Sequence, residues 1–178
     1  NYNVSLYGSN DDGNFRLSYT LMDNDGILPN TDLKRHNFTL NAGYNLSKRF
    51  RVDVSTSYIK SLSNNRAVNS YGTESVMYLF TWYGMQINTN NLKEYWQRGL
   101  EGFQQFNYNY NYHDNPYFNM YENTNGLDKN RLMGNVKLSY QITDELSLSL
   151  RTGTDYYDEL REIKRAYSTQ RFPRGQFR

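Results

Sequence analysis

Apolar and polar residues alternate along much of this chain. Between Phe15 and Leu21 every second residue is apolar, and Arg16, Ser18 and Thr20 lie between them. The same alternation recurs in residues 2–6, 38–46, 50–58, 132–142 and 146–156. Because a β-strand places successive side chains on opposite faces, this pattern predicts six strands, each with one apolar and one polar face.

Short and long connections between these strands also alternate. Residues 9–13, 47–49 and 143–145 form short turns, whereas residues 23–34 and about 61–129 form long loops. In an up-and-down antiparallel sheet, this order places every short turn at one end and every long loop at the other. The sequence therefore predicts an all-β fold of antiparallel up-and-down strands, with long loops that contain short helices.

Two architectures explain the alternating faces. A transmembrane β-barrel has strands that are apolar outside and polar inside, with short periplasmic turns and long extracellular loops. A soluble β-sandwich has one wet face on each sheet. The strict alternation of short and long connections favours the barrel. Six strands cannot close such a barrel, because the smallest have about eight, so we expect this chain to be one section of it.

The barrel hypothesis assigns a role to each face of the predicted strands. Apolar positions would meet lipid, and aromatic residues near strand ends would suit the membrane interfaces. Polar positions would face the lumen. The polar residues expected there include Arg16, Asn41, Asp53, Lys137, Ser149 and Arg151.

The longest loop contains its own patterns. Val76, Leu79, Phe80 and Tyr83 have helical spacing and predict a short amphipathic helix, and a second short helix is expected over residues 92–98. Residues 106–112 alternate aromatic residues with Asn and predict a strand with an aromatic face and an amide face.

Aromatic side chains can stack on sugar rings or apolar groups, and Asn can both donate and accept hydrogen bonds. We therefore predict contacts with a ligand or a protein lid through Trp96, Tyr108, Tyr110 and Tyr112. The alternative is a hairpin that only packs on other loops.

The composition excludes several classes of protein. Aromatic residues make up 16% of the 178 residues, which argues against a disordered chain despite the mean hydropathy of -0.91. The sequence contains no run of 18 apolar residues, so it predicts no transmembrane helix. The net charge of +2 is too small and scattered for a nucleic-acid partner. The absence of Cys removes disulfides, thiolate ligands and thiol nucleophiles.

No constellation for catalysis or metal binding stands out. His36 and His113 have no companion ligands at metal spacing. The stretch 23–26, Asp-Asn-Asp-Gly, is better explained as a turn than as a calcium loop, because Leu21 takes the first ligand position. We expect no enzymatic activity, no metal and no cofactor.

Three parts of the sequence carry a family resemblance: residues 34–44, residues 115–119 leading through 122–124 to 130–135, and residues 146–153. They resemble strands of SusC/RagA-type TonB-dependent outer-membrane transporters. The resemblance implies a 22-stranded barrel, plugged by an N-terminal domain, in the outer membrane of a Gram-negative bacterium. It further implies import of an oligosaccharide or a peptide, powered through TonB, with a SusD-type surface lipoprotein as a lid.

Neither a plug domain nor a TonB-contacting segment is recognisable in the sequence. We therefore expect residues 1–178 to be a partial barrel domain of a larger protein, to which transport as a whole belongs. Two rival hypotheses remain. One is a secreted carbohydrate-binding β-sandwich, and the other is a purely structural section that contacts no ligand.

Overall fold

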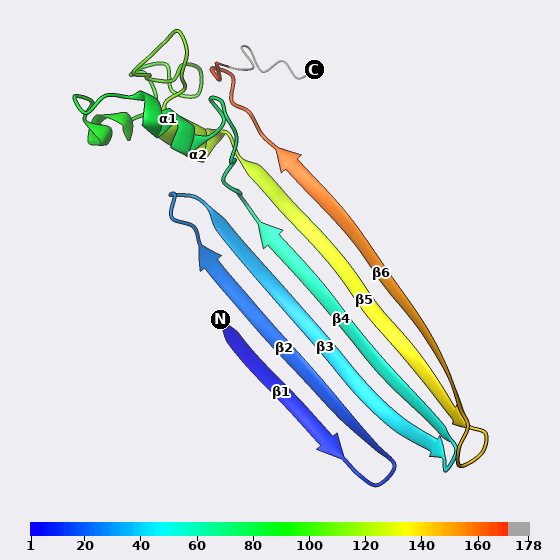
Figure 1. Cartoon of the computed structure of the whole chain (residues 1–178). Coiled ribbons are helices and arrows are strands. Elements are labelled where there is room, and N and C mark those ends of the chain that lie inside the picture. Colours follow the sequence, from blue (N-terminus) through cyan, green and yellow to red (C-terminus); the bar gives the residue numbers. More distant parts are fainter. Residues whose placement is uncertain (171–178) are drawn as a thin grey trace. The chain divides into compact units, whose positions relative to one another are not determined.

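The computed structural model describes residues 1–170, which contain one antiparallel sheet with its strands in chain order (Figure 1). The strands are β1 (Tyr2–Ser9), β2 (Gly13–Asp25), β3 (Asp32–Ser47), β4 (Phe50–Ser63), β5 (Asn125–Gln141) and β6 (Ser147–Ile163). All six predicted strands and the up-and-down topology are confirmed. Within the described residues the sheet is open, with β1 and β6 at its edges, and is not a closed barrel. The sequence of residues 172–178 also suggests a loop, but these residues lie outside the described part of the chain.

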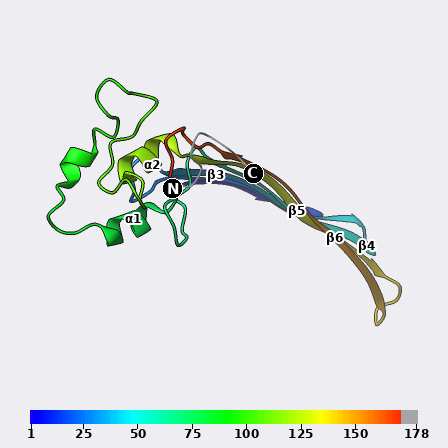
Figure 2. The ribbon, with the colours of Figure 1, turned by 90° about the horizontal axis from the view of Figure 1, so that it is seen from above.

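Most apolar side chains of the sheet lie on one face. Residues opposite each other on neighbouring antiparallel strands share a face. The contacts that join the strands on this face are the opposed pairs Val4–Tyr19 and Phe38–Tyr58, the Tyr19–Phe38 rings at 4.7 Å and the Phe50–Tyr140 rings at 6.4 Å. This face remains open, since Leu148 and Leu150 are 62% and 64% exposed. The sheet curves along its strands (Figure 2).

Strand β5 begins earlier, and strand β6 ends later, than the alternation predicted, because charged residues continue the ladder. Lys129 Nζ lies 2.9 Å from Glu159 Oε2, and Arg131 donates to both carboxylate oxygens of Asp155. Cross-strand pairs of opposite charge stabilise a sheet without any apolar residue. Apolar periodicity alone therefore underestimates these strands.

The short turns are closed by side chains that accept backbone hydrogen bonds. Asn10 Oδ1 accepts from the amides of Asp12 and Gly13 at 3.1 and 2.7 Å. Thr143 Oγ1 accepts from the amide of Leu146 at 3.1 Å. These local bonds replace the backbone partners that a tight turn cannot supply.

The chain divides into two compact units, which we call the sheet unit and the loop unit. The sheet unit comprises residues 1–24, 34–62 and 128–160, and the loop unit comprises residues 25–33, 63–127 and 161–170. The loop unit contains helix α1 (Val76–Trp82), a short 3-10 helix η1 (Thr89–Leu92) and helix α2 (Pro116–Glu122). Its apolar core consists of Val76, Leu79, Leu92, Phe118 and Met120.

The helix predictions for the loop unit succeed only in part. Helix α1 confirms the helical spacing noted above. The helix expected over residues 92–98 is wrong, because η1 ends at Leu92 and the following segment folds back as a bridge between Trp96 and Gln105. Gly99 and Gly102, with φ near +80°, allow that reversal. Helix α2 lies where the family resemblance suggested barrel sequence.

The strand predicted over residues 106–112 is also wrong. Asn107 Oδ1 accepts from the amide of Asn109 at 3.0 Å, and Asn109 Oδ1 accepts from the amides of Asn111 and Tyr112. These short-range bonds wind the backbone into turns and compete with an extended ladder. The regular Asn spacing that resembled a strand is thus the spacing of successive turns.

Candidate functional site

An aromatic groove runs along helix α1 in the loop unit. Its volume is about 620 Å³, and its lining includes Tyr71, Met77, Tyr78 and Trp82, together with the polar residues Asn69, Ser70, Ser75 and Thr81. Volumes of this order are typical of small-molecule sites. Tyr71 and Trp82 are 83% and 55% exposed, so both rings are available to a ligand.

The positions of the rings follow from the helix. Ser75 caps α1, because its Oγ accepts from the amide of Tyr78 at 3.4 Å. Tyr78 and Trp82 are then one turn apart on the same helical face, with their ring centroids at 5.9 Å. Tyr71 meets the edge of Tyr78 at 4.7 Å. The result is an aromatic surface beside hydroxyl and amide groups, which suits a ligand with apolar faces and polar edges.

His113 supports this aromatic surface from the interior. Its ring stacks on Trp82 at 5.8 Å and on Tyr108 at 6.1 Å, and only 8% of the residue is exposed. Burial lowers the pKa of the imidazole, so the ring is uncharged at neutral pH. Its Nδ1 atom has no hydrogen-bond partner in the described part of the chain. His113 therefore serves the groove as a neutral stacking partner.

Tyr108, one of the predicted contact residues, is half-buried and packs within the loop unit. Its hydroxyl donates to the carbonyl of Leu79 at 3.2 Å, and its ring meets Tyr83 at 5.5 Å. Burial, followed by the nearby Tyr83, raises the pKa of Tyr108 to about 12. The hydroxyl stays protonated and ties the 106–112 turns to the end of α1.

The other predicted contact residues are separated from one another. Trp96 is half-buried and packs edge-on against Phe118 at 5.3 Å. Tyr110 and Tyr112 are exposed, at 52% and 70%. Among the described residues no ring contact joins these four aromatic residues to one another, and the proposed contacts of all four remain predictions.

Sequence reasoning did not identify Tyr71, Met77 and Trp82 as candidate contacts. The useful signal was the aromatic pair Tyr78 and Trp82 at helical spacing, preceded by Ser75 as a cap. Tyr71 gave no such signal, because it reaches the groove from the irregular segment before the helix.

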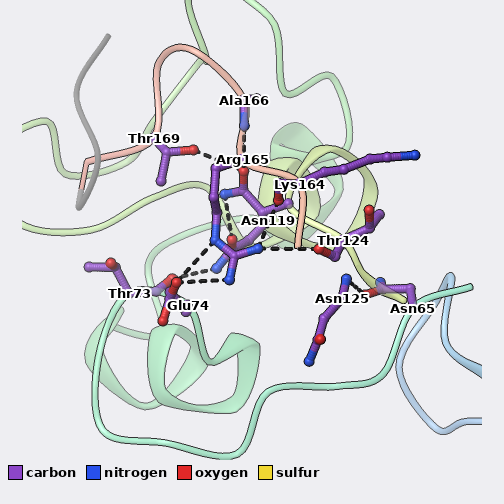
Figure 3. A network of polar contacts seen from close by, with 11 residues as sticks. Asn65, Thr73, Glu74, Asn119, Thr124, Asn125, Lys164, Arg165, Ala166 and Thr169 are labelled. Atoms are coloured by element: carbon purple, nitrogen blue, oxygen red, sulfur yellow. Dashed lines mark hydrogen bonds and ion pairs between the residues drawn. The ribbon is translucent and has the colours of Figure 1, made fainter. Parts of the chain in front are cut away.

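A buried polar network holds that irregular segment in place (Figure 3). Arg165 donates to Glu74 Oε1 at 2.8 and 3.0 Å and to the carbonyl of Thr124 at 3.3 Å. Asn119 Nδ2 donates to the carbonyl of Thr73. The segment after β6 is thereby joined to the residues that precede α1, which keeps Tyr71 and Ser75 in position.

A second network centres on Asp114. Its Oδ1 atom accepts from Gln105 Nε2 at 2.6 Å and from the amide of Gln170 at 2.9 Å, whereas Oδ2 is buried without a partner among the described residues. Desolvation, the largest cause, raises the pKa of this carboxyl to about 6. Asp114 thus joins the long loop to the segment after β6 at an electrostatic cost.

In the sheet unit, the six predicted lumen residues share the polar face. They are Arg16, Asn41, Asp53, Lys137, Ser149 and Arg151. Asn41 Oδ1 accepts from Ser55 Oγ at 2.7 Å, and Asp53 accepts from Arg51 Nε at 2.9 Å. Their common face follows from the confirmed alternation, while the lumen itself remains a prediction.

Residues 1–170 contain no group of three or more His, Cys, Asp or Glu side chains arranged to hold a metal ion. Among these same residues, no helix has the length and apolar character needed to cross a membrane. Comparison with protein-family models finds no match for the chain, and no curated protein matches it.

Proposed function

We propose that this chain is a wall section of an outer-membrane, TonB-dependent nutrient importer of SusC/RagA type. The complete protein would take up an oligosaccharide or a peptide together with a SusD-type surface lipoprotein. TonB would act on a plug domain that belongs to another part of the protein. The observation that carries the proposal is the single apolar face of the sheet, which has the banded composition of a lipid-facing surface.

The bands follow the strands from the short turns towards the long loops. Near the short turns the apolar face carries Phe15, Tyr44, Phe50 and Tyr140. Aliphatic residues such as Leu40, Val54 and Leu138 follow. Aromatic residues return at Phe38, Tyr58 and Tyr156. Two aromatic girdles around an aliphatic band are typical of outer-membrane barrels.

Ion pairs end the apolar band on the side of the long loops. On this same face Lys34 lies 3.3 Å from Asp23, and Lys60 lies 3.4 Å from Asp128. From Phe50 to Lys60 strand β4 extends about 33 Å at roughly 3.3 Å per residue, or about 25 Å of depth at a tilt near 40°. Outer-membrane barrels have an apolar band of about 25 Å, which supports the proposal.

A secreted carbohydrate-binding β-sandwich is the rival class. A sandwich needs a second sheet to cover the apolar face. Residues 1–170 form one sheet, and its apolar face is open, which favours the wall of a barrel.

Sidedness tests this proposal directly, and this chain contributes no native Cys to the labelling background. Single variants Met85→Cys, in the long loop, and Asp144→Cys, in a short turn, would be expressed in the complete protein. We expect a membrane-impermeant maleimide to label Met85→Cys on intact cells and Asp144→Cys only after lysis. Labelling of Asp144→Cys on intact cells, or absence of the protein from the outer-membrane fraction, contradicts the proposal.

The aromatic groove is the proposed contact of the loop unit with the ligand or the lid. In the complete protein, Tyr71→Ala/Trp82→Ala should weaken binding of one of these partners about tenfold, because each stacked ring contributes about 0.5–1.5 kcal/mol beyond its area. Phe103→Ala is the matched control, since Phe103 is 68% exposed in the same unit outside the groove lining. Unchanged affinity for both partners, at normal surface abundance, would mean that the groove binds neither of them. That result would favour the hypothesis of a purely structural section that contacts no ligand.

A further inference from the structure

The polar face of the sheet unit carries unbalanced positive charge. Each of its three carboxylates is already paired with one cation, in the pairs Arg51–Asp53, Lys129–Glu159 and Arg131–Asp155. Four cations on the same face remain without a carboxylate within the described residues: Arg16, Arg35, Lys137 and Arg151. Of these, Arg35 donates to Ser61 Oγ at 3.3 Å, which leaves its charge uncompensated.

The opposite face of the sheet has no such excess. Its two lysines, Lys34 and Lys60, both lie within ion-pair distance of aspartates. The uncompensated charge of the sheet therefore concentrates on the face that the barrel hypothesis turns towards the lumen. A wall lined by one sign of charge raises the local concentration of ligands of the opposite sign.

The four cations are spread out and do not form one pocket. They lie on β2, β3, β5 and β6, and Arg35 and Lys137 are separated by roughly 25 Å along the strand direction. One small anion cannot contact them all. A chain molecule with a repeated negative charge can contact several of them at once, or one after another as it moves along the wall.

We propose that this face attracts an acidic oligosaccharide, with carboxylates repeated along its chain, as the cargo of the importer. This inference rests on the proposed function for the direction of the face and on the uncompensated cations for the charge of the cargo. Lys137 and Arg151, on the neighbouring strands β5 and β6, are the pair of cations chosen to test the proposal.

Binding of defined probes to the purified complete protein tests the proposal. The probes are a tetramer of galacturonic acid, which is anionic, a heparin oligosaccharide, which is also anionic, and maltotetraose, which is neutral. We expect at least one anionic probe to bind, and to bind more weakly as the salt concentration rises. In Lys137→Gln/Arg151→Gln its affinity should fall about tenfold, which corresponds to about 1.4 kcal/mol, because two charges that attract the probe are lost.

The matched control removes the same charge from a short turn. Lys48 and Arg49 are exposed between β3 and β4, and Lys48→Gln/Arg49→Gln should leave the affinity unchanged. Failure of both anionic probes to bind overturns the proposal. Unchanged binding together with a lower melting temperature in Lys137→Gln/Arg151→Gln also overturns it, and assigns these cations to a contact within the protein. Membrane fractionation of the same cells separates either result from a failure of the proposed importer function.

Discussion

The guanidinium of Arg165 and the carboxylate of Glu74 form an ion pair inside the loop unit, at 2.8 Å, although they are far apart in sequence. Their side chains are 5% and 15% exposed. A buried ion pair of this kind adds little net stability, but removal of one partner leaves a buried charge without its counterion. The pair therefore makes the segment after β6 and the residues before α1 dependent on each other.

Arg165→Met should destabilise the loop unit by about 3 kcal/mol, because the buried carboxylate of Glu74 would lose its ion pair with Arg165. Protease cleavage of the long loop in the complete protein, followed as a function of urea concentration, measures this loss. Lys164→Met is the control, since Lys164 and Glu162 form an exposed pair that is worth at most about 1 kcal/mol. If the two substitutions reduced stability equally, the buried pair would be no more important than the exposed pair, which would contradict this prediction.

Asp114 should make the loop unit less stable as pH rises. Its pKa is about 6 in the folded protein against 3.8 for the free side chain, so the folded state binds the proton more tightly. Stability should therefore fall between about pH 4 and pH 6 and stay low above that range, by about 3 kcal/mol in total. Protease resistance of the long loop across this range is the measurement.

Asp114→Asn isolates this effect from its charged neighbours. Glu74 raises and Arg165 lowers the pKa of Asp114, and both remain in the variant. His113 acts in the opposite sense, because its pKa is lowered by burial and its protonation in acid destabilises the fold. The difference in stability between the native protein and Asp114→Asn should change as the pH rises from 4 to 6. A constant difference across that range would show that Asp114 does not titrate there.

Asn115 should be among the most sensitive residues of the loop unit. Its Oδ1 atom caps α2 by accepting from the amide of Tyr117 at 2.8 Å, and its Nδ2 atom donates to the carbonyls of Leu92 and Phe106. Asn115→Ala removes the cap and leaves both carbonyls without this donor, at a cost of about 3 kcal/mol or more. Ser75→Ala removes a cap alone and should cost only about 1 kcal/mol in the same unfolding assay. A smaller loss in Asn115→Ala than in Ser75→Ala would contradict this account.

The two faces of the sheet should respond differently to a new charge. Leu138 shares the apolar face of β5 with Tyr140, whereas Ser149 lies on the polar face of β6. Leu138→Arg should cost about 2–4 kcal/mol in the complete membrane-inserted protein, and Ser149→Arg much less. Folding assays into lipid bilayers, with urea titration, compare the two. Equal tolerance would mean that the apolar face does not meet lipid.

Much of the sheet followed from the sequence because its signals are local. Alternating residues such as Phe15, Leu17 and Tyr19 define a strand without reference to anything distant. The turn at Asn10 is equally local, since its side chain bonds to amides two and three residues later. The start of β5 and the end of β6 were missed because they depend on cross-strand pairs such as Lys129–Glu159, which a single stretch of sequence does not reveal.

In the loop unit the same reasoning largely failed. The segment around Tyr108 alternates like a strand, yet Asn107 and Asn109 direct their side chains to their own backbone. The same residues can form either a strand or successive turns by local interactions alone. The packing of Tyr108 on His113 and Tyr83 therefore decides between the two conformations. Helix α2 had a local signal in Asn115 followed by Pro116, a cap and a first-turn residue.

The sequence by itself determined the strands, their two faces, their order of short and long connections and the helix α1. Each of these depends on the period of the backbone and on neighbours within a few residues. The tertiary structure alone decided that Tyr71 meets Tyr78, that Tyr108 packs on Tyr83 and His113, and that Arg165 pairs with Glu74. These contacts join residues through loop closure and burial, whose free energies depend on the whole packed unit and not on any segment within it.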